Sequence, residues 1–328
     1  MEIIISLVKL VFFFLLLLQA VPVMVWLERR LLAWFQLRPG PNRVGPFGLL
    51  QTLADGIKLL FKESIMHKEV DVFLYLLGPF LVVFTAFAAF AAIPIGAPVE
   101  FMGYTIPLQI ADLNVGLLFV FAVLSIGSYG LILAAWGSNS KYALLGGLRS
   151  TAQMISYELS LTTSALAVVV LTGTFSLTGI VNAQENVWFA FQQPLAFVIF
   201  FICTVAETNR TPFDLPEAET ELVAGFHTEY SGMKFAMFFM GEYINIITVS
   251  ALTVILFLGG WHLPFIDFIP GILVFGGKVG VLVLIFIWLR ATFPRLRYDR
   301  LMAFGWKILL PIAILNLFGT AVFHVLMA

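Results

Sequence analysis

The chain has 328 residues, of which 61% are hydrophobic and 11% are charged, and its mean hydropathy is +1.01. Soluble domains carry about 25% charged residues, so the composition excludes a soluble globular protein and predicts an integral membrane protein. The formal net charge of -1 gives no indication of a nucleic-acid partner, and we expect none.

Eight apolar segments approach the length of about 20 residues that a helix needs to cross a bilayer. We therefore predict an all-α integral membrane protein in which residues 1–328 form one polytopic domain. The predicted spans are about 3–27, 72–94, 114–136, 153–175, 190–206, 233–258, 276–292 and 304–326. The first segment has neither a basic start nor a small-residue cleavage site, so we expect a retained span rather than a signal peptide.

The Lys and Arg residues are distributed unevenly between the two sides of the predicted bundle. If the N-terminus lies outside, all of them except Lys9 and Lys278 fall in interior segments or in the adjoining helix ends. Because positively charged residues concentrate on the cytoplasmic side of membrane proteins, this distribution predicts eight spans with the N-terminus outside.

A Pro- and Gly-rich stretch at 38–46 follows the first span and precedes a segment with helical periodicity, residues 48–63. Its apolar stripe comprises Leu49, Leu53, Ile57 and Leu60, and its polar stripe comprises Gln51, Asp55, Lys58 and Lys62. Steps of three and four residues are typical of an amphipathic helix. We predict that this helix lies in the membrane interface.

Three glutamates occur inside predicted spans or at their ends: Glu158, Glu207 and Glu242. At 1.5 Å per residue, Glu158 lies roughly 7–8 Å from the inner end of the fourth predicted span, and Glu242 lies roughly 12 Å from that of the sixth. Ionisable groups in a membrane are costly and usually have a function, so the three predict a path for protons or ions. The alternative is that they are polar contacts between helices.

The predicted interior segment 207–232 is acidic, against the basic bias of the other interior segments. Its acids are Glu207, Asp214, Glu217, Glu219, Glu221 and Glu229, opposed by Arg210, and its apolar residues include Phe213, Leu215, Leu222, Val223 and Phe226. Because like charges repel and the apolar side chains avoid water, we expect the segment to pack against another protein or to line a polar cavity. A solvated acidic loop is the alternative.

Basic residues follow two predicted spans on the inner side. They are Arg29 and Arg30, next to Glu28, and Arg290, Arg295, Arg297 and Arg300. The simplest interpretation is that they determine topology. In the alternative, some of them pair with the acidic segment and shift the pKa values of its carboxyl groups.

We expect redox chemistry to belong to other chains. Cys203 is the only cysteine, and no Gly-rich nucleotide-binding turn follows a strand. This chain is therefore expected to hold no flavin, haem or iron–sulfur cluster and no metal site.

Long strings of the sequence resemble one protein family from end to end. They are ERRLLAWFQLRPGPNRVGPFGLLQTLADGIKLLFKE at 28–63, KYALLGGLRSTAQMISYELSL at 141–161, AETNRTPFDLPEAETELVAGFHTEYSGMKFA at 206–236, GEYIN at 241–245 and FPRLRYD at 293–299. They resemble the H subunit of respiratory complex I, the NADH:quinone oxidoreductase, which is subunit 1 in mitochondria. Motifs of this length are highly specific.

The resemblance implies a subunit that forms much of the chamber for its substrate, ubiquinone or menaquinone, on the cytoplasmic side of a bacterial inner membrane. It implies that quinone enters between the first span, the helix at 48–63 and the sixth span. The residues assigned to this passage are Arg29, Arg30, Asp55, Lys58, Phe226 and Arg290.

The resemblance also implies a coupling role. Glu158, Glu207 and Glu242 resemble acids that lead protons from the chamber towards antiporter-like subunits, and Glu217, Glu219, Glu221 and Glu229 belong to the acidic loop. The implied partners are the hydrophilic subunits of the quinone site, the iron–sulfur connecting subunits, the small membrane subunits beside the antiporter-like ones, and lipid. We expect quinone reduction to change the proton demand of the chamber and to bias these acids.

Two alternatives remain open. One is the equivalent subunit of an energy-converting membrane hydrogenase or a formate hydrogenlyase, which needs no quinone and has a hydrogenase large subunit as its partner. The other is a stand-alone transporter that uses the glutamates for proton symport, which the long motif match disfavours.

Overall fold

The structure is a computed structural model and describes residues 2–101, 104–215, 223–264 and 268–327. Its helices are α1 (Glu2–Phe35), α2 (Gln51–Phe61), α3 (Val72–Phe90), α4 (Gly116–Gly137), α5 (Lys141–Thr172), α6 (Leu177–Asn182), α7 (Phe189–Gln192), α8 (Pro194–Glu207), α10 (Met233–Phe257), α11 (Gly271–Thr292), α12 (Tyr298–Phe304) and α13 (Leu310–Met327). Short 3₁₀ turns occupy Pro46–Gly48 and Gly225–His227, and a π-helical turn at Gly305–Leu309 joins α12 to α13.

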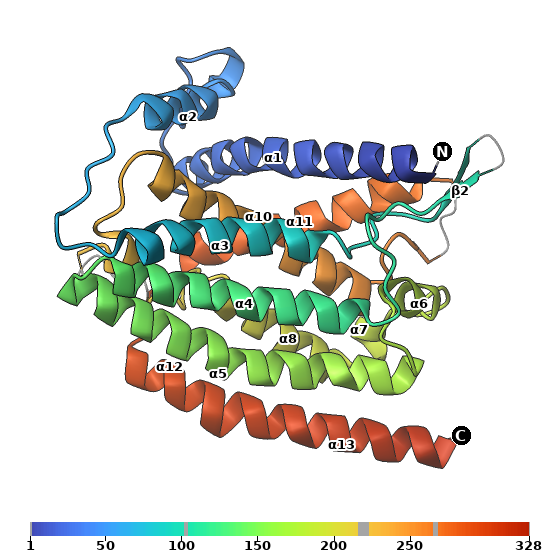
Figure 1. Cartoon of the computed structure of the whole chain (residues 1–328). Helices are drawn as coiled ribbons and strands as arrows, with labels where there is room; N and C mark the ends of the chain where they lie inside the picture. Colours follow the sequence, from blue (N-terminus) through green and yellow to red (C-terminus); the bar gives the residue numbers. More distant parts are fainter. Residues whose placement is uncertain (1, 102–103, 216–222, 265–267, 328) are drawn as a thin grey trace.

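The long helices lie side by side in a bundle whose two ends differ (Figure 1). One end carries both chain termini, α6, α7 and a hairpin of β1 (Val99–Phe101) and β2 (Tyr104–Ile106). The opposite end carries α2, which lies beyond the last turn of α1. We call the first end the outer end and the second the inner end, following the topology that the basic residues predict.

Seven helices of the described chain are long and apolar enough to cross a membrane, with α12 to α13 counted as one continuous helix. This supports an all-α membrane protein. The helix α8 is apolar but has only 14 residues. At 1.5 Å per residue it is about 21 Å long, against a hydrocarbon core of about 30 Å.

Helix bounds and predicted spans differ mainly at polar ends. The helix α1 continues through the charged residues 28–30 to Phe35, and α5 begins at Lys141 rather than near 153. Hydropathy registers only the apolar part of a helix, whereas Lys, Arg and Glu are good helix formers that extend it beyond the membrane. The β1–β2 hairpin is a small departure from the all-α prediction, in a segment of aromatic and β-branched residues that favour strands.

Glycines allow three of the helices to approach closely. A Cβ atom on Gly78 of α3 would lie 2.6 Å from the Cβ of Ala134 in α4, and one on Gly241 of α10 would lie 2.6 Å from a methyl carbon of Val82 in α3. In a membrane, helices associate by such close van der Waals packing, because lipid tails are as apolar as the side chains.

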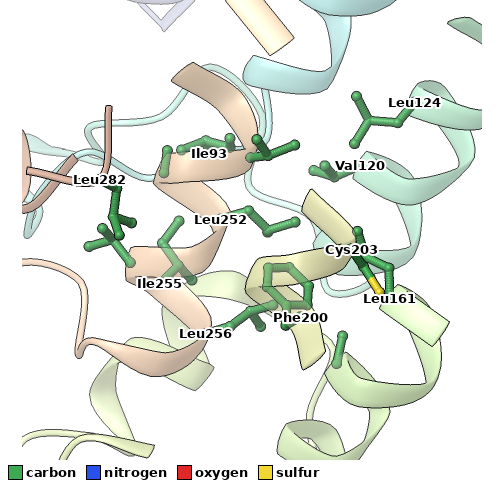
Figure 2. Close-up of a cluster of buried hydrophobic side chains, with 14 of the residues drawn as sticks. Ile93, Val120, Leu124, Leu161, Phe200, Cys203, Leu252, Ile255, Leu256 and Leu282 are labelled. Carbon is green, nitrogen blue, oxygen red and sulfur yellow. The ribbon is translucent and has the colours of Figure 1, made fainter. Parts of the chain in front are cut away.

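The apolar core is concentrated around α10. Figure 2 shows the buried side chains of this cluster, contributed by α4, α5, α8, α10, α11 and the segment after α3. They include Ile93, Val120, Phe200, Cys203, Ile255 and Leu256, none of which is exposed. This core holds α8 and α10 in place, and these are the helices that carry Glu207 and Glu242.

Candidate functional site

Arg210 is the centre of a buried ionic network. Its Nε lies 2.7 Å from Oε1 of Glu242 on α10, and its Nη1 donates to Oε1 of Glu28 on α1 over 3.1 Å. The guanidinium also lies over the ring of Tyr243, 4.9 Å from its centroid. Only 8% of the Arg210 side chain and 7% of the Glu28 side chain are exposed. The arginine therefore joins two carboxylates that are far apart in the sequence.

The end of α8 places Arg210 in this position. The N–H of Arg210 donates to Val205 O and the N–H of Asn209 donates to Ala206 O, with Asn209 at a φ of 50°. This pattern is a Schellman motif, in which Asn is tolerated at the left-handed position. Gln153 of α5 then holds the following turn, since its Nε2 donates to Ala206 O over 2.8 Å and to Phe213 O over 2.7 Å.

A second arginine completes the network. Arg290 on α11 donates to Oε1 of Glu28, so Glu28 has two guanidinium partners and Arg210 has two carboxylate partners. The four side chains carry balanced charge when all are ionised. Balance matters because a buried charge without a partner is strongly destabilising, whereas a paired and hydrogen-bonded one is tolerated.

Glu242 also lines a small cavity together with Glu207. The cavity has a volume of about 50 Å³, and its polar lining includes Glu207, Asn209, Glu242 and Asn245. Among the described residues, Glu207 Oε2 and Asn245 Oδ1 are buried without a hydrogen-bond partner. A water needs roughly 10–15 Å³ of such volume and a few polar neighbours, so the cavity has room for several waters.

Glu158 lies in a neighbouring but different cavity. Ser125 of α4 donates to its Oε1, and the two residues line a cavity of about 260 Å³ between α4 and α5. Glu158 interacts electrostatically with Glu207. The three glutamates singled out from the sequence are thus neighbours, but only Glu207 and Glu242 share one cavity. Because α5 begins at Lys141, Glu158 lies about 25 Å along its helix.

The residues assigned to the quinone passage form two groups. At α2, Arg29 pairs with Asp55, and Gln51 donates to Asp55 over 2.9 Å. Deeper in the bundle, Phe226 lines the cavity of Glu207 and Arg290 belongs to the ionic network. Partial burial raises the pKa of Asp55, but the hydrogen bonds from Arg29 and Gln51 and the charges of Arg29 and Lys58 outweigh it and hold the pKa below the ordinary value of 3.8.

The acidic segment is partly described. Glu229 pairs with His67 over 2.8 Å, and Asp214 pairs with Arg295 over 3.0 Å. The second contact confirms that a basic inner end pairs with the acidic segment. The predicted loop acids Glu217, Glu219 and Glu221 lie outside the described residues.

The sequence did not single out Glu28 or Arg210 as site residues. Glu28 stood among basic residues that explain topology, and Arg210 was only the counter-charge of an acidic segment. A signal was present in each case. Glu28 directly follows an apolar run, and Arg210 is the single basic residue between Cys203 and His227, which are positions where an unpaired charge is costly.

Together these features define a polytopic membrane protein with a charge-balanced ionic network and a polar cavity buried near the inner end of its helix bundle. The model of the NADH dehydrogenase family matches residues 8–321. The chain belongs to this family.

Its relatives cover nearly the whole chain. The H subunit of the NADH-quinone oxidoreductase of Protochlamydia amoebophila is 59% identical over 300 residues, which are 92% of this chain and 91% of the relative. The first of the numbered H subunits of this enzyme in Geobacter metallireducens is 54% identical over 320 residues, with 98% and 96% covered. The second of those in Geobacter sulfurreducens is 56% identical over 313 residues, with 95% and 94% covered.

Proposed function

We propose that this chain is the membrane subunit of an NADH-quinone oxidoreductase that couples quinone reduction to proton translocation. The observation that carries the proposal is the pair of unpartnered buried oxygens, on Glu207 and Asn245, that line one cavity with Glu242. A purely structural polar group in a membrane is normally satisfied by protein. Groups left open towards a cavity that holds water are suited to exchange protons.

The ionic network provides the coupling in this proposal. Arginine stays protonated, so only Glu28 and Glu242 can change the charge of the network. When Glu242 takes up a proton, its attraction to Arg210 weakens and the arginine is left with Glu28. Any event in the chamber that favours one of these pairings shifts the proton affinity of Glu242, and the reverse holds because binding linkage is reciprocal. Glu207 and Glu158 continue the path towards partner subunits.

The quinone passage that we propose starts between α1, α2 and α10. Arg29, Asp55 and Lys58 line its entrance, and Phe226 and Arg290 lie further in. Arg30 contacts the loop before α2 instead, where Asn42 Oδ1 and Phe47 O accept its hydrogen bonds. A passage of this kind needs few charged contacts, because a quinone ring is neutral and its tail is apolar.

The remaining assignments follow from the same proposal. The chain has eight spans, α8 being a short fifth one, and its N-terminus lies outside a bacterial inner membrane. The acidic segment and the chamber lie on the cytoplasmic side. The hydrophilic quinone-site subunits, the iron–sulfur connecting subunits and the small membrane subunits are its neighbours, and NADH oxidation and electron transfer take place in other chains.

The test uses Glu242→Gln and Glu207→Gln in the assembled complex. Gln keeps the shape of the side chain and removes the titratable group, so we expect several-fold lower proton translocation for each quinone reduced. Proton uptake and NADH:quinone turnover are measured on the same vesicles. The matched control is Glu185→Gln, an exposed glutamate between α6 and α7. Unchanged proton stoichiometry in both test variants would remove this cavity from the proton path.

A further inference from the structure

A larger cavity lies against the inner end of α1. Its volume is about 510 Å³, within the range of roughly 300–1,000 Å³ that is usual for ligand pockets. It is lined by Trp26, Leu27, Arg30, Leu31, Trp34, Arg38, Pro39, Gly40 and Asn42. Glu28, Arg210, Glu242 and Asp55 are absent from this lining, so the cavity is separate from the site described above.

The end of α1 builds this cavity from a single stretch of chain. The N–H of Leu37 donates to Trp34 O and the N–H of Arg38 donates to Ala33 O, which again is a Schellman motif. The chain then folds back along the helix, and a Cβ on Gly40 would lie 3.2 Å from the Cα of Arg30. Arg38 is thereby held beside the last turns of α1 and opposite Arg30.

The cavity has positive charge that the described protein does not neutralise. Arg30 donates to Asn42 Oδ1 over 3.2 Å and to Phe47 O over 2.9 Å, and Arg38 Nε donates to Gln36 Oε1 over 2.7 Å. All of these acceptors are neutral, and no carboxylate of the described residues pairs with either arginine. Arg29, the next residue in the helix, is paired with Asp55.

The depth of the cavity corresponds to the headgroups of the inner leaflet. Counted from Leu27, the last apolar residue of the predicted span, Arg30 lies about 4–5 Å and Trp34 about 10 Å further along the helix. The headgroup layer extends roughly 5–8 Å beyond the hydrocarbon core on each side. Trp34 is 76% exposed and Leu37 is 96% exposed, as expected of residues that contact lipid in this layer.

We propose that this cavity binds one anionic phospholipid. The phosphate lies between Arg30 and Arg38, and the acyl chains follow α1 past Leu31 and Leu27. Guanidinium groups bind phosphate through paired, charge-assisted hydrogen bonds, and basic pockets at the inner ends of spans favour anionic headgroups. Neighbouring residues in a helix point about 100° apart, so Arg30 faces the lipid while Arg29 faces α2. A quinone beside Asp55 and a lipid beside Arg38 thus occupy different sides of α1.

The test is photo-crosslinking of the purified intact complex with a photoactivatable phosphatidylglycerol, followed by peptide mapping. We expect labelling of the peptide 26–42, reduced about tenfold in Arg38→Gln because a charge-assisted contact to phosphate is lost. Arg43→Gln is the matched control, since Arg43 is an exposed arginine of the same loop that does not line the cavity. Arg38→Lys keeps the charge without the paired donors and should label to an intermediate degree, so it replaces Arg38→Gln if that variant does not assemble.

Several outcomes would overturn the proposal. Equal loss in Arg43→Gln would mean that only the charge of the loop matters, and equal labelling by a phosphatidylcholine probe would mean that only the acyl chains bind. Displacement of the probe by inorganic phosphate would identify a free-anion site. Displacement by a short-chain quinone would assign the cavity to the quinone passage. Quinone reduction is measured in the same samples and should be unchanged in Arg38→Gln, so the lipid proposal and the proposed function fail independently.

Discussion

The two ends of α10 and α11 hold buried polar groups in opposite ways. At the outer end, the ammonium of Lys278 donates to the backbone carbonyls of Leu258, Gly260 and His262 over 2.6, 2.9 and 2.6 Å. At the inner end, Arg290 and Glu242 of the same two helices join a network of charged side chains. The outer contacts tie one titratable group to atoms that cannot titrate, whereas the inner contacts tie titratable groups to one another.

Gln184 strengthens this contrast. Its side-chain amide donates to Ile180 O and Ile255 O and accepts from the N–H groups of Phe189 and Gly259, so its hydrogen-bonding capacity is fully used. Glu207 and Asn245, near the inner end, keep buried oxygens without a partner among the described residues. A saturated polar group stabilises a fold, and one with spare capacity on a water-sized cavity can change its protonation. The contrast separates structural from functional polar groups within one bundle.

The largest effect is expected from Arg210→Ala. Removing the arginine leaves Glu28 and Glu242 with less positive charge in a buried position, at a cost of about 3–5 kcal/mol. We expect a severe loss of assembled complex, measured by native gel electrophoresis and thermal inactivation. Arg297→Ala is the control, because Arg297 forms an exposed pair with Asp299. If the two variants were equally stable, the network would have no special role in holding α1 and α10 together.

The contrast is sharpened by Lys278→Met at the outer end. The variant leaves buried carbonyls after α10 without a donor, which costs about 1–3 kcal/mol for an unsatisfied group. We expect a lower thermal stability of the complex but an unchanged number of protons translocated for each quinone reduced. Both quantities are measured on one preparation. A changed stoichiometry would break the division into a structural outer end and a functional inner end.

The smallest effect is expected at Asp55. Its pair with Arg29 is partly exposed, so Asp55→Asn should cost at most about 1 kcal/mol. Because the folded protein lowers the pKa of Asp55, the pair contributes stability above the ordinary value of 3.8 and loses it as the pH falls further. The difference in thermal stability between the wild type and the variant should therefore be present at neutral pH and shrink below pH 3.8. A difference that grows with acidification would contradict this assignment of charge.

Several elements follow directly from periodicity and hydropathy. The amphipathic helix predicted at 48–63 corresponds to α2 (Gln51–Phe61), and the sixth predicted span, 233–258, corresponds closely to α10. Both are continuous in sequence, so local spacing is sufficient to find them. The break before α8 was less visible, because Pro194 is tolerated at the start of a helix and the residues around it are as apolar as a span.

The sequence by itself determined that this chain crosses a membrane, which end carries the basic residues, and that Glu207 and Glu242 are costly enough to need a reason. Composition and spacing decide these points, because each depends on residues close together in the chain. Only the tertiary structure decided that Arg210 meets Glu28, 182 positions away, and that Arg290 meets Glu28 across 262 positions. A buried charge demands a partner, but the packing of α1, α8, α10 and α11 selects which one.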